Sequence, residues 1–206
     1  MRCRKKVGAF RMSILVFMGI KHCGKSTQGR CIAQKYNVPF FDTDDVIAKQ
    51  TKLSPRELYT QQGESAFKVA ECEACKNILS QIDDSGTARI TAVIATGGGI
   101  CTNKDALAAL AGTVQFIFLQ SPEKLAADRI VCESSVAPDG TILNIPAYIA
   151  KKSPHSIAEV RDIFHSFYEE RIKLYSEIAT VTVEMLDAPV QVNTERILKA
   201  VQTLAR

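Results

Sequence analysis

The sequence lacks any apolar run long enough to cross a membrane or to form the core of a signal peptide. Residues 1–11 are basic, and the apolar run that follows them, Ser13–Met18, is only six residues long. A signal peptide needs about 7–15 apolar residues after its basic segment, and a membrane helix needs about 20. We therefore expect no membrane partner, and we expect residues 1–12 to be a disordered extension or a mis-called start rather than a targeting signal.

An excess of positive charge is also missing from the body of the chain. Residues 1–11 carry five of the 26 basic residues and none of the 22 acidic ones, so the remaining 21 basic residues nearly balance the acids. Proteins that bind nucleic acid through their surface carry a clear basic patch. The composition therefore predicts no nucleic-acid partner.

The cysteines do not form a set that could bind zinc. Only Cys72 and Cys75 have C-x-x-C spacing, and no second pair completes a four-ligand site. Their spacing in the helical pattern FKVAECEACKNIL places both on one face, which favours a buried thiol pair over a redox or metal site. The odd, irregular set of seven cysteines predicts reduced thiols and hence a cytoplasmic location.

Linkers and internal repeats are absent, so we predict one domain over residues 13–206. Apolar strand patterns lie at 13–18, 38–42, 90–96, 113–119 and 178–185, and helical patterns at 25–36, 63–81, 156–177 and 194–204. Continuously apolar strands that alternate with helices indicate a parallel sheet covered on both faces. The chain is thus expected to be an α/β three-layer sandwich with a five-stranded parallel sheet.

Serine residues mark three expected helix starts, and one long segment has no regular pattern. Ser54 and Ser121 each precede a proline, and Ser156 precedes Glu159 by three residues, as in a capping box. The segment Cys132–His155 is rich in proline and irregular. A loop of this length in a compact domain is usually a lid or a disordered segment.

Residues 19–27, GIKHCGKST, match the Walker A pattern between a strand and a helix. The glycines turn backbone N–H groups toward a phosphate, and the start of the following helix adds partial positive charge. Lys25 supplies a full charge for the β- and γ-phosphates, and the Ser26 hydroxyl is placed to bind Mg²⁺. The loop predicts binding of ATP or GTP with Mg²⁺. The expected nucleotide-binding residues are Gly19, His22, Cys23, Gly24, Lys25, Ser26 and Thr27.

Two acidic residues follow the second strand. Asp42 and Asp44 are two positions apart, so both point to one face if the segment is extended. One carboxylate could join the Mg²⁺ shell while the other accepts a hydrogen bond from an attacking hydroxyl. The alternative is that Asp42 caps a helix, a position for which aspartate is well suited.

Five motifs together give a more specific indication. They are Gly19–Thr27, Asp42-Thr43-Asp44, Gly63-Glu64-x-x-Phe67-Lys68-x-x-Glu71, Thr96-Gly97-Gly98-Gly99 and Arg171-x-x-x-Tyr175-x-x-x-Ala179. In order and spacing the sequence resembles the shikimate kinase family. The resemblance implies a P-loop NTPase-like fold, with a substrate-binding helical segment at about 43–81 and a lid at about 132–155. It also implies transfer of the γ-phosphate of ATP to the 3-hydroxyl of shikimate, a step of aromatic amino acid biosynthesis.

The resemblance also implies roles for individual residues. Lys25 and Asp44 would be catalytic, Ser26 and Asp42 would hold Mg²⁺, and Arg129 would stack on adenine or be an ordinary surface arginine. The substrate-binding set would be Asp44, Lys68, Gly97, Gly98, Gly99 and Arg171. The implied partners are therefore ATP and a small carboxylated polyol, bound by a monomer.

Three positions depart from the family pattern. Lys68 stands where the family has an arginine, and lysine lacks the two-pronged fork that binds a carboxylate. Residues 131–160 contain no arginine, although the family places a lid arginine over the transferring phosphate; Lys151 and Lys152 could substitute for it or be ordinary solvated charges. His22 replaces a glycine, but histidine tolerates left-handed backbone. Two alternatives therefore stay open: a kinase for another hydroxy acid, and a nucleotide-binding protein with impaired catalysis.

Overall fold

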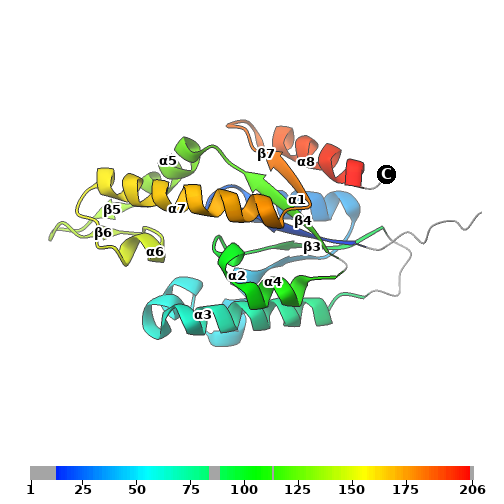
Figure 1. Ribbon diagram of the computed structural model, residues 1–206, viewed down its shortest axis with the longest axis horizontal. Helices are drawn as coiled ribbons and strands as arrows, with labels where there is room; N and C mark the ends of the chain where they lie inside the picture. Colours follow the sequence, from blue (N-terminus) through cyan, green and yellow to red (C-terminus); the bar gives the residue numbers. More distant parts are fainter. Residues whose placement is uncertain (1–12, 84–88, 113, 205–206) are drawn as a thin grey trace, which may run out of the picture.

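The computed structural model describes residues 13–83, 89–112 and 114–204, and the expected extension at 1–12 lies outside them. A five-stranded sheet forms the centre of the molecule, with its strands in the order β2-β3-β1-β4-β7 (Figure 1). The strands are β1 Ser13–Met18, β2 Phe40–Asp42, β3 Ile90–Ala95, β4 Val114–Gln120 and β7 Val181–Glu184. All neighbouring pairs run parallel, as predicted.

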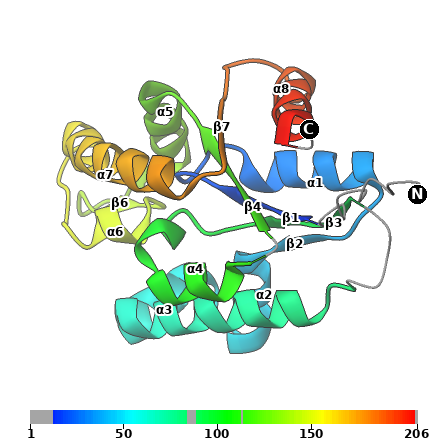
Figure 2. The same ribbon diagram turned by 45° about the vertical axis from the view of Figure 1, so that its right-hand side comes forward.

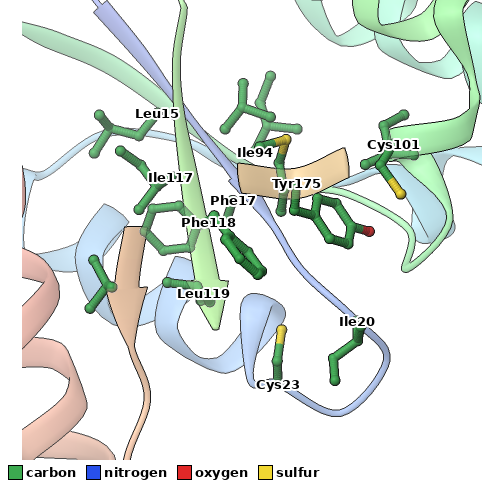
Figure 3. Packing of buried hydrophobic residues seen from close by; sticks show 14 of the residues in the cluster. Leu15, Phe17, Ile20, Cys23, Ile94, Cys101, Ile117, Phe118, Leu119 and Tyr175 are labelled. Atoms are coloured by element: carbon green, nitrogen blue, oxygen red, sulfur yellow. The ribbon is translucent and has the colours of Figure 1, made fainter. Parts of the chain in front are cut away.

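The central strands contain continuous apolar runs because both of their faces are covered. Residues Ile14–Met18 of β1 and Ala92–Ala95 of β3 are buried without alternation. Figure 3 shows Leu15 and Phe17 of β1 and Ile117 and Phe118 of β4 in the buried core, with Ile117 and Phe118 on opposite faces of the sheet. Burial of this kind, at roughly 25 cal/mol per Å² of apolar surface, is the main force that holds the sheet and its helices together.

Helices cover both faces of this sheet, which confirms the predicted three layers. On one face lie α1 Lys25–Tyr36 and α8 Val190–Leu204, which pack side by side (Figure 2). On the other face lie α3 Pro55–Ser80 and α4 Lys104–Leu110. The helices α5 Glu123–Glu133 and α7 Ile157–Ile178 pack against each other beside β4.

The segment after β2 forms a pair of helices with a small core of its own. Helix α2, Thr43–Thr51, packs on α3 through Ile47, Leu58 and Ala74. Ser54 and Glu57 form the predicted capping box at the start of α3. The helix is kinked at Gly63, where φ is 82° and ψ is 178°, and this left-handed backbone explains why the position is glycine. The helix start predicted at Ser54 is therefore confirmed, and the helical pattern at 63–81 continues the same helix beyond the kink.

The other two expected caps differ from the prediction. Ser121 does not cap α5, because Pro122 occupies the N-cap position and makes no side-chain cap bond. Ser156 does cap α7 by accepting a hydrogen bond from the Glu159 N–H. The Glu159 carboxylate, however, accepts from the N–H of His155 rather than that of Ser156, so the capping box is incomplete.

The sequence suggested that the segment Cys132–His155 is irregular, but part of it has regular secondary structure. It contains the short antiparallel strands β5 Ser135–Val136 and β6 Ile142–Leu143 and the helix α6 Ala147–Ala150. Ile142, Ile145 and Ile149 are buried and anchor this segment to the main core. Short strands, a short helix and buried isoleucines therefore take the place of the long loop that the sequence predicted.

Two further expectations concern the whole chain. All cysteines in the described part of the chain are free, and Cys72 and Cys75 are buried side chains of α3, as predicted. No helix in the ranges that the structure describes is both long enough and apolar enough to cross a membrane.

Candidate active site

The loop between β1 and α1 has the geometry of a phosphate cradle. Gly24 precedes the first residue of α1 with φ 96°, and no side chain caps the helix, so its first N–H groups are free to bind an anion. Lys25 is buried at this helix start, and its ammonium donates to the carbonyls of Gly19 and Ile20, each at 2.9 Å. His22 has φ 65°, so it adopts the left-handed backbone expected of it.

The first acidic residue after β2 reaches the cradle directly. The Ser26 hydroxyl donates to Asp42 Oδ2 at 2.5 Å, while Asp42 Oδ1 accepts from the N–H of Asp44 at 3.1 Å. Asp42 is thus also the N-cap of α2, so the alternative interpretation as a helix cap is part of its role. The expectation that Asp44 lies in an extended segment was wrong, because Asp44 belongs to the first turn of α2.

The turn after β3 packs against the cradle so closely that only glycine fits. A Cβ at Gly98 would lie 2.9 Å from the Lys21 nitrogen and 3.4 Å from Lys21 Cα. A Cβ at Gly97 would lie 3.0 Å from Glu71 Oε1 and 3.2 Å from Asp44 Oδ1, whereas one at Gly99 would meet only Arg171, at 3.8 Å. Gly98 therefore allows the turn to approach the cradle, and Gly97 allows it to approach the two carboxylates.

The half-buried side chain of Asp44 and the buried side chain of Glu71 both lie against Gly97. Asp44 Oδ1 and Glu71 Oε1 are buried and accept no hydrogen bond from the described residues. Burial and the neighbouring Asp42 raise the pKa of Asp44, whereas the charges of Lys25 and Lys21 lower it. Burial also raises the pKa of Glu71 to about 7, although the amide of Asn103 donates to its other oxygen at 2.9 Å. Unpaired buried acceptors of this kind are typical of sites that bind hydroxyl donors.

Arg171 of α7 is held beside the glycine turn. Its guanidinium donates to the carbonyl of Gly98 at 2.9 Å and lies 4.4 Å from the ring centre of Tyr148 and 5.3 Å from that of Phe167. Stacking on aromatic rings fixes the plane of the guanidinium and leaves its remaining N–H groups for a ligand. Tyr148 belongs to α6, so the segment between α5 and α7 contributes directly to the placement of Arg171.

Lys68 lies on the same side of the site but is already paired. Its ammonium is 2.9 Å from Glu64 Oε1, one turn earlier on α3. This pair is half-exposed, and such pairs contribute about 0.3–0.5 kcal/mol. A ligand carboxylate could therefore compete for Lys68 at little cost.

Arg129 is not a free surface arginine. It donates to the carbonyl of His22 at 2.7 Å, which joins α5 to the cradle. The His22 ring lies 3.3 Å from the carboxylate of Glu133, and burial lowers the pKa of this histidine. Arg129 thus lines the cavity beside the cradle.

Tyr175 supports the cradle in a way that the sequence analysis did not assign. Its ring is fully buried and stacked on Phe118 at 5.2 Å between ring centres (Figure 3), and its hydroxyl donates to the carbonyl of Gly19 at 3.2 Å. Glu71 and Asn103 were likewise not assigned. Tyr175 and Glu71 stand in the quoted motifs, whereas Asn103 has no signal in the sequence beyond its position as a helix cap.

One cavity of about 1320 Å³ brings these residues together. Every expected site residue lines it except Gly19, which lies beneath the cradle and accepts hydrogen bonds from Lys25 and Tyr175. The described residues contain no cluster of three or more His, Cys, Asp or Glu side chains that could hold a metal ion. Ser26 and Asp42, which touch each other, nevertheless provide the hard oxygen ligands that Mg²⁺ uses when phosphates and water complete its shell.

Comparisons with known proteins indicate the same family as the sequence motifs. The family model described as shikimate kinase matches residues 21–202. A shikimate kinase of Aquifex aeolicus is 28% identical over 184 residues, covering 89% of this chain and 94% of the relative. A shikimate kinase of Clostridium botulinum is 32% identical over 149 residues, covering 69% and 85%.

The fold agrees with that of solved structures. The shikimate kinase from Acinetobacter baumannii, solved in complex with shikimate, superposes with a TM-score of 0.71 at 23% identity and covers 95% of this chain and 97% of that one. At this identity the likeness supports the fold alone. Because the family model matches residues 21–202, which include Lys25, both carboxylates, the glycine turn and Arg171, the chain belongs to the shikimate kinase family.

Proposed function

We propose that this protein transfers the γ-phosphate of ATP to the 3-hydroxyl of shikimate to give shikimate 3-phosphate. One observation carries the proposal: two buried carboxylate oxygens without a partner among the described residues, on Asp44 and Glu71, share one cavity with a phosphate cradle and Arg171. The carboxylates would accept hydrogen bonds from ring hydroxyls, and the guanidinium would bind the ring carboxylate. A carboxylated polyol satisfies all three groups at once.

The nucleotide end of the cavity consists of Lys21–Thr27 and Arg129. Here the free N–H groups of the loop and of the first turn of α1 would bind the phosphates, and Lys25 would exchange its carbonyl partners for phosphate oxygens. Cys23 and Thr27 line the same cradle. The contact between Arg129 and the His22 carbonyl supports the proposal that this arginine stacks on adenine.

Ser26 and Asp42 would hold Mg²⁺ at this end. Their oxygens are already in contact at 2.5 Å, which fits a shared position beside a hard cation. The bound ion would offset the charge of the β- and γ-phosphates. Asp42 at the same time fixes the first turn of α2 through the N–H of Asp44, so the metal side and the acceptor side are held by one residue.

The acceptor end consists of Asp44, Lys68, Glu71, Gly97–Gly99 and Arg171. Asp44 would orient the attacking hydroxyl and take up its proton, a role for which a raised pKa suits a carboxylate. Arg171, and more weakly Lys68, would bind the substrate carboxylate. The segment 43–81 would then be the substrate-binding part of one domain, and the segment 132–155 its lid.

The two alternatives have less support. Membership of the family and the whole set of acceptor-end residues oppose a protein without catalysis, and Lys68 is the one residue of this set that favours another hydroxy acid. The free cysteines support a cytoplasmic location, and the proposed form of the protein is a monomer.

The test is release of ADP by the purified chain with shikimate, compared with other polyol acids. We expect shikimate-dependent turnover that falls by at least about a thousandfold in Lys25→Ala, because this change removes the charge held in the cradle. Lys35→Ala, an exposed substitution in the last turn of α1, is the matched control and should retain full activity. Turnover no greater with shikimate than in Lys25→Ala would reject the proposal, and turnover with a different acid would replace the acceptor.

A further inference from the structure

The positive side chains around the cavity differ in whether the protein already uses them. Four of them donate to protein acceptors or form an ion pair: Lys25, Lys68, Arg129 and Arg171. Arg56, Lys151 and Lys152 line the same cavity without such a partner, and so does Lys21, which is exposed and makes no hydrogen bond or ion pair with the described residues. Lys21 is therefore a cation of the site that is free to bind a ligand.

The backbone of Lys21 lies where the two ends of the cavity meet. It packs directly against Gly98 of the acceptor end, with the Lys21 nitrogen 2.9 Å from the place of a Gly98 Cβ. The positive charge of Lys21 lowers the pKa of Asp44. In contrast, the charge of Lys151 acts on Glu64, beside Lys68. Both lysines line the cavity, but Lys21, unlike Lys151, belongs to the cradle loop that packs against Gly98.

Phosphoryl transfer develops charge on the oxygens of the group in flight, and kinases offset this charge with a cation that contacts the transferring group. The segment 131–160 contains no arginine that could contact the transferring group. Position 21 is one of the four variable positions of the Walker A pattern, so a lysine there leaves the glycines of the cradle in place.

We propose that Lys21 supplies this charge, so that the phosphate cradle itself carries the cation that contacts the transferring phosphoryl group. The inference rests on the proposed kinase function. As the P–O bond to ADP breaks, the bond to the acceptor oxygen forms and the hydroxyl proton passes to Asp44. The Lys21 ammonium keeps its protons and binds an equatorial oxygen of the phosphoryl group.

The test compares Lys21→Met, which keeps the length of the side chain but removes its charge, with Lys21→Arg. We expect kcat to fall about a hundredfold in Lys21→Met, with the KM for shikimate and the affinity for ADP changed by less than about threefold. Lys21→Arg should recover most of the turnover. Lys35→Met is the control for loss of a lysine outside the cavity, and thermal unfolding of each variant shows that it folds.

A second measurement distinguishes binding of the transferring phosphoryl group by Lys21 from a purely structural role of this residue. ADP with aluminium fluoride mimics the transferring group, so Lys21→Met should weaken its binding about a hundredfold relative to the binding of ADP alone. This readout needs no phosphorylation of shikimate. If the wild type phosphorylates no shikimate, the proposed function fails, and Lys21 is judged by aluminium fluoride binding alone.

The competing variant is Lys151→Met. Normal kcat and normal aluminium fluoride binding in Lys21→Met would overturn the inference, and a large loss of both in Lys151→Met would transfer the role to the segment between α5 and α7. A loss in Lys21→Met that appears only in KM, with kcat unchanged, would also overturn it, since that result indicates uniform binding rather than stabilisation of the transition state.

Discussion

At the nucleotide end of the cavity the key polar side chains bond to the protein itself, whereas at the acceptor end two buried carboxylate oxygens have no partner among the described residues. Lys25, Ser26 and Asp42 each bond to a group within or next to the cradle. Asp44 and Glu71 each keep one buried oxygen unpaired. The two ends share one cavity, and they touch where Gly98 packs against the backbone of Lys21, a contact that we call the seam.

This difference reflects how each end is built. The cradle is a continuous segment between a buried strand and a helix, so its shape follows from local backbone geometry. The acceptor end is assembled from α2, α3, the turn after β3, and α7, so its groups meet only in the folded chain. Leaving buried acceptors unpaired costs stability, about 1–3 kcal/mol for each, and this cost is offset when a ligand donates to them.

The largest expected effect follows from the unpaired state of Glu71. Its folded pKa of about 7 exceeds the unfolded value of 4.5, so the folded chain holds a proton that the unfolded chain has released. Stability should therefore fall as pH rises from about 4.5 to about 7, by about 3 kcal/mol. Glu71→Gln should remove this loss and be more stable than the wild type above pH 7. Urea unfolding across this pH range measures the effect.

Glu73→Gln is the matched control for this experiment. Glu73 is two residues along α3, exposed, and paired with Lys76 at 2.7 Å. Its substitution should leave the pH dependence of the wild type intact. An equal pH dependence in Glu71→Gln and wild type would show that burial of the Glu71 carboxylate does not lower stability. The proposed difference between the two ends of the cavity would then be wrong.

The seam between the two ends gives the next largest effect. Gly98→Ala should reduce the free energy of unfolding by about 2 kcal/mol, because its Cβ would push against the backbone of Lys21. Both ATP and shikimate should bind more weakly. Gly99→Ala, whose Cβ would meet only ordinary contact at 3.8 Å, should cost much less stability. Similar unfolding curves for the two variants would mean that the loops do not depend on this contact.

The smallest effect concerns Lys68 at the acceptor end alone. Lys68→Arg should lower the KM for shikimate about 5- to 30-fold, since a second charge-assisted hydrogen bond is worth about 1–2 kcal/mol. The KM for ATP should not change. Lys76→Arg, an exposed lysine on the same helix, serves as the control. An unchanged KM for shikimate in Lys68→Arg would indicate that Glu64 keeps this side chain away from the substrate.

Prediction from the sequence was most successful where structure is local. The strand, the cradle and α1 follow one another in the order that the Walker A pattern requires, and α1 spans Lys25–Tyr36 as predicted. It failed at element ends, where packing decides. Ser121 does not cap α5, because Pro122 occupies the cap position, and the kink of α3 at Gly63 was not predicted.

The sequence by itself determined the parallel sheet, the phosphate cradle and the family, because runs of apolar residues and short spaced motifs act through neighbours along the chain. Only the tertiary structure decided that Tyr175 holds Gly19, that Tyr148 stacks on Arg171, and that Lys21 lies against Gly98. These contacts join residues that are far apart in the sequence. Their geometry depends on how the helices pack on the sheet, and no local pattern encodes it.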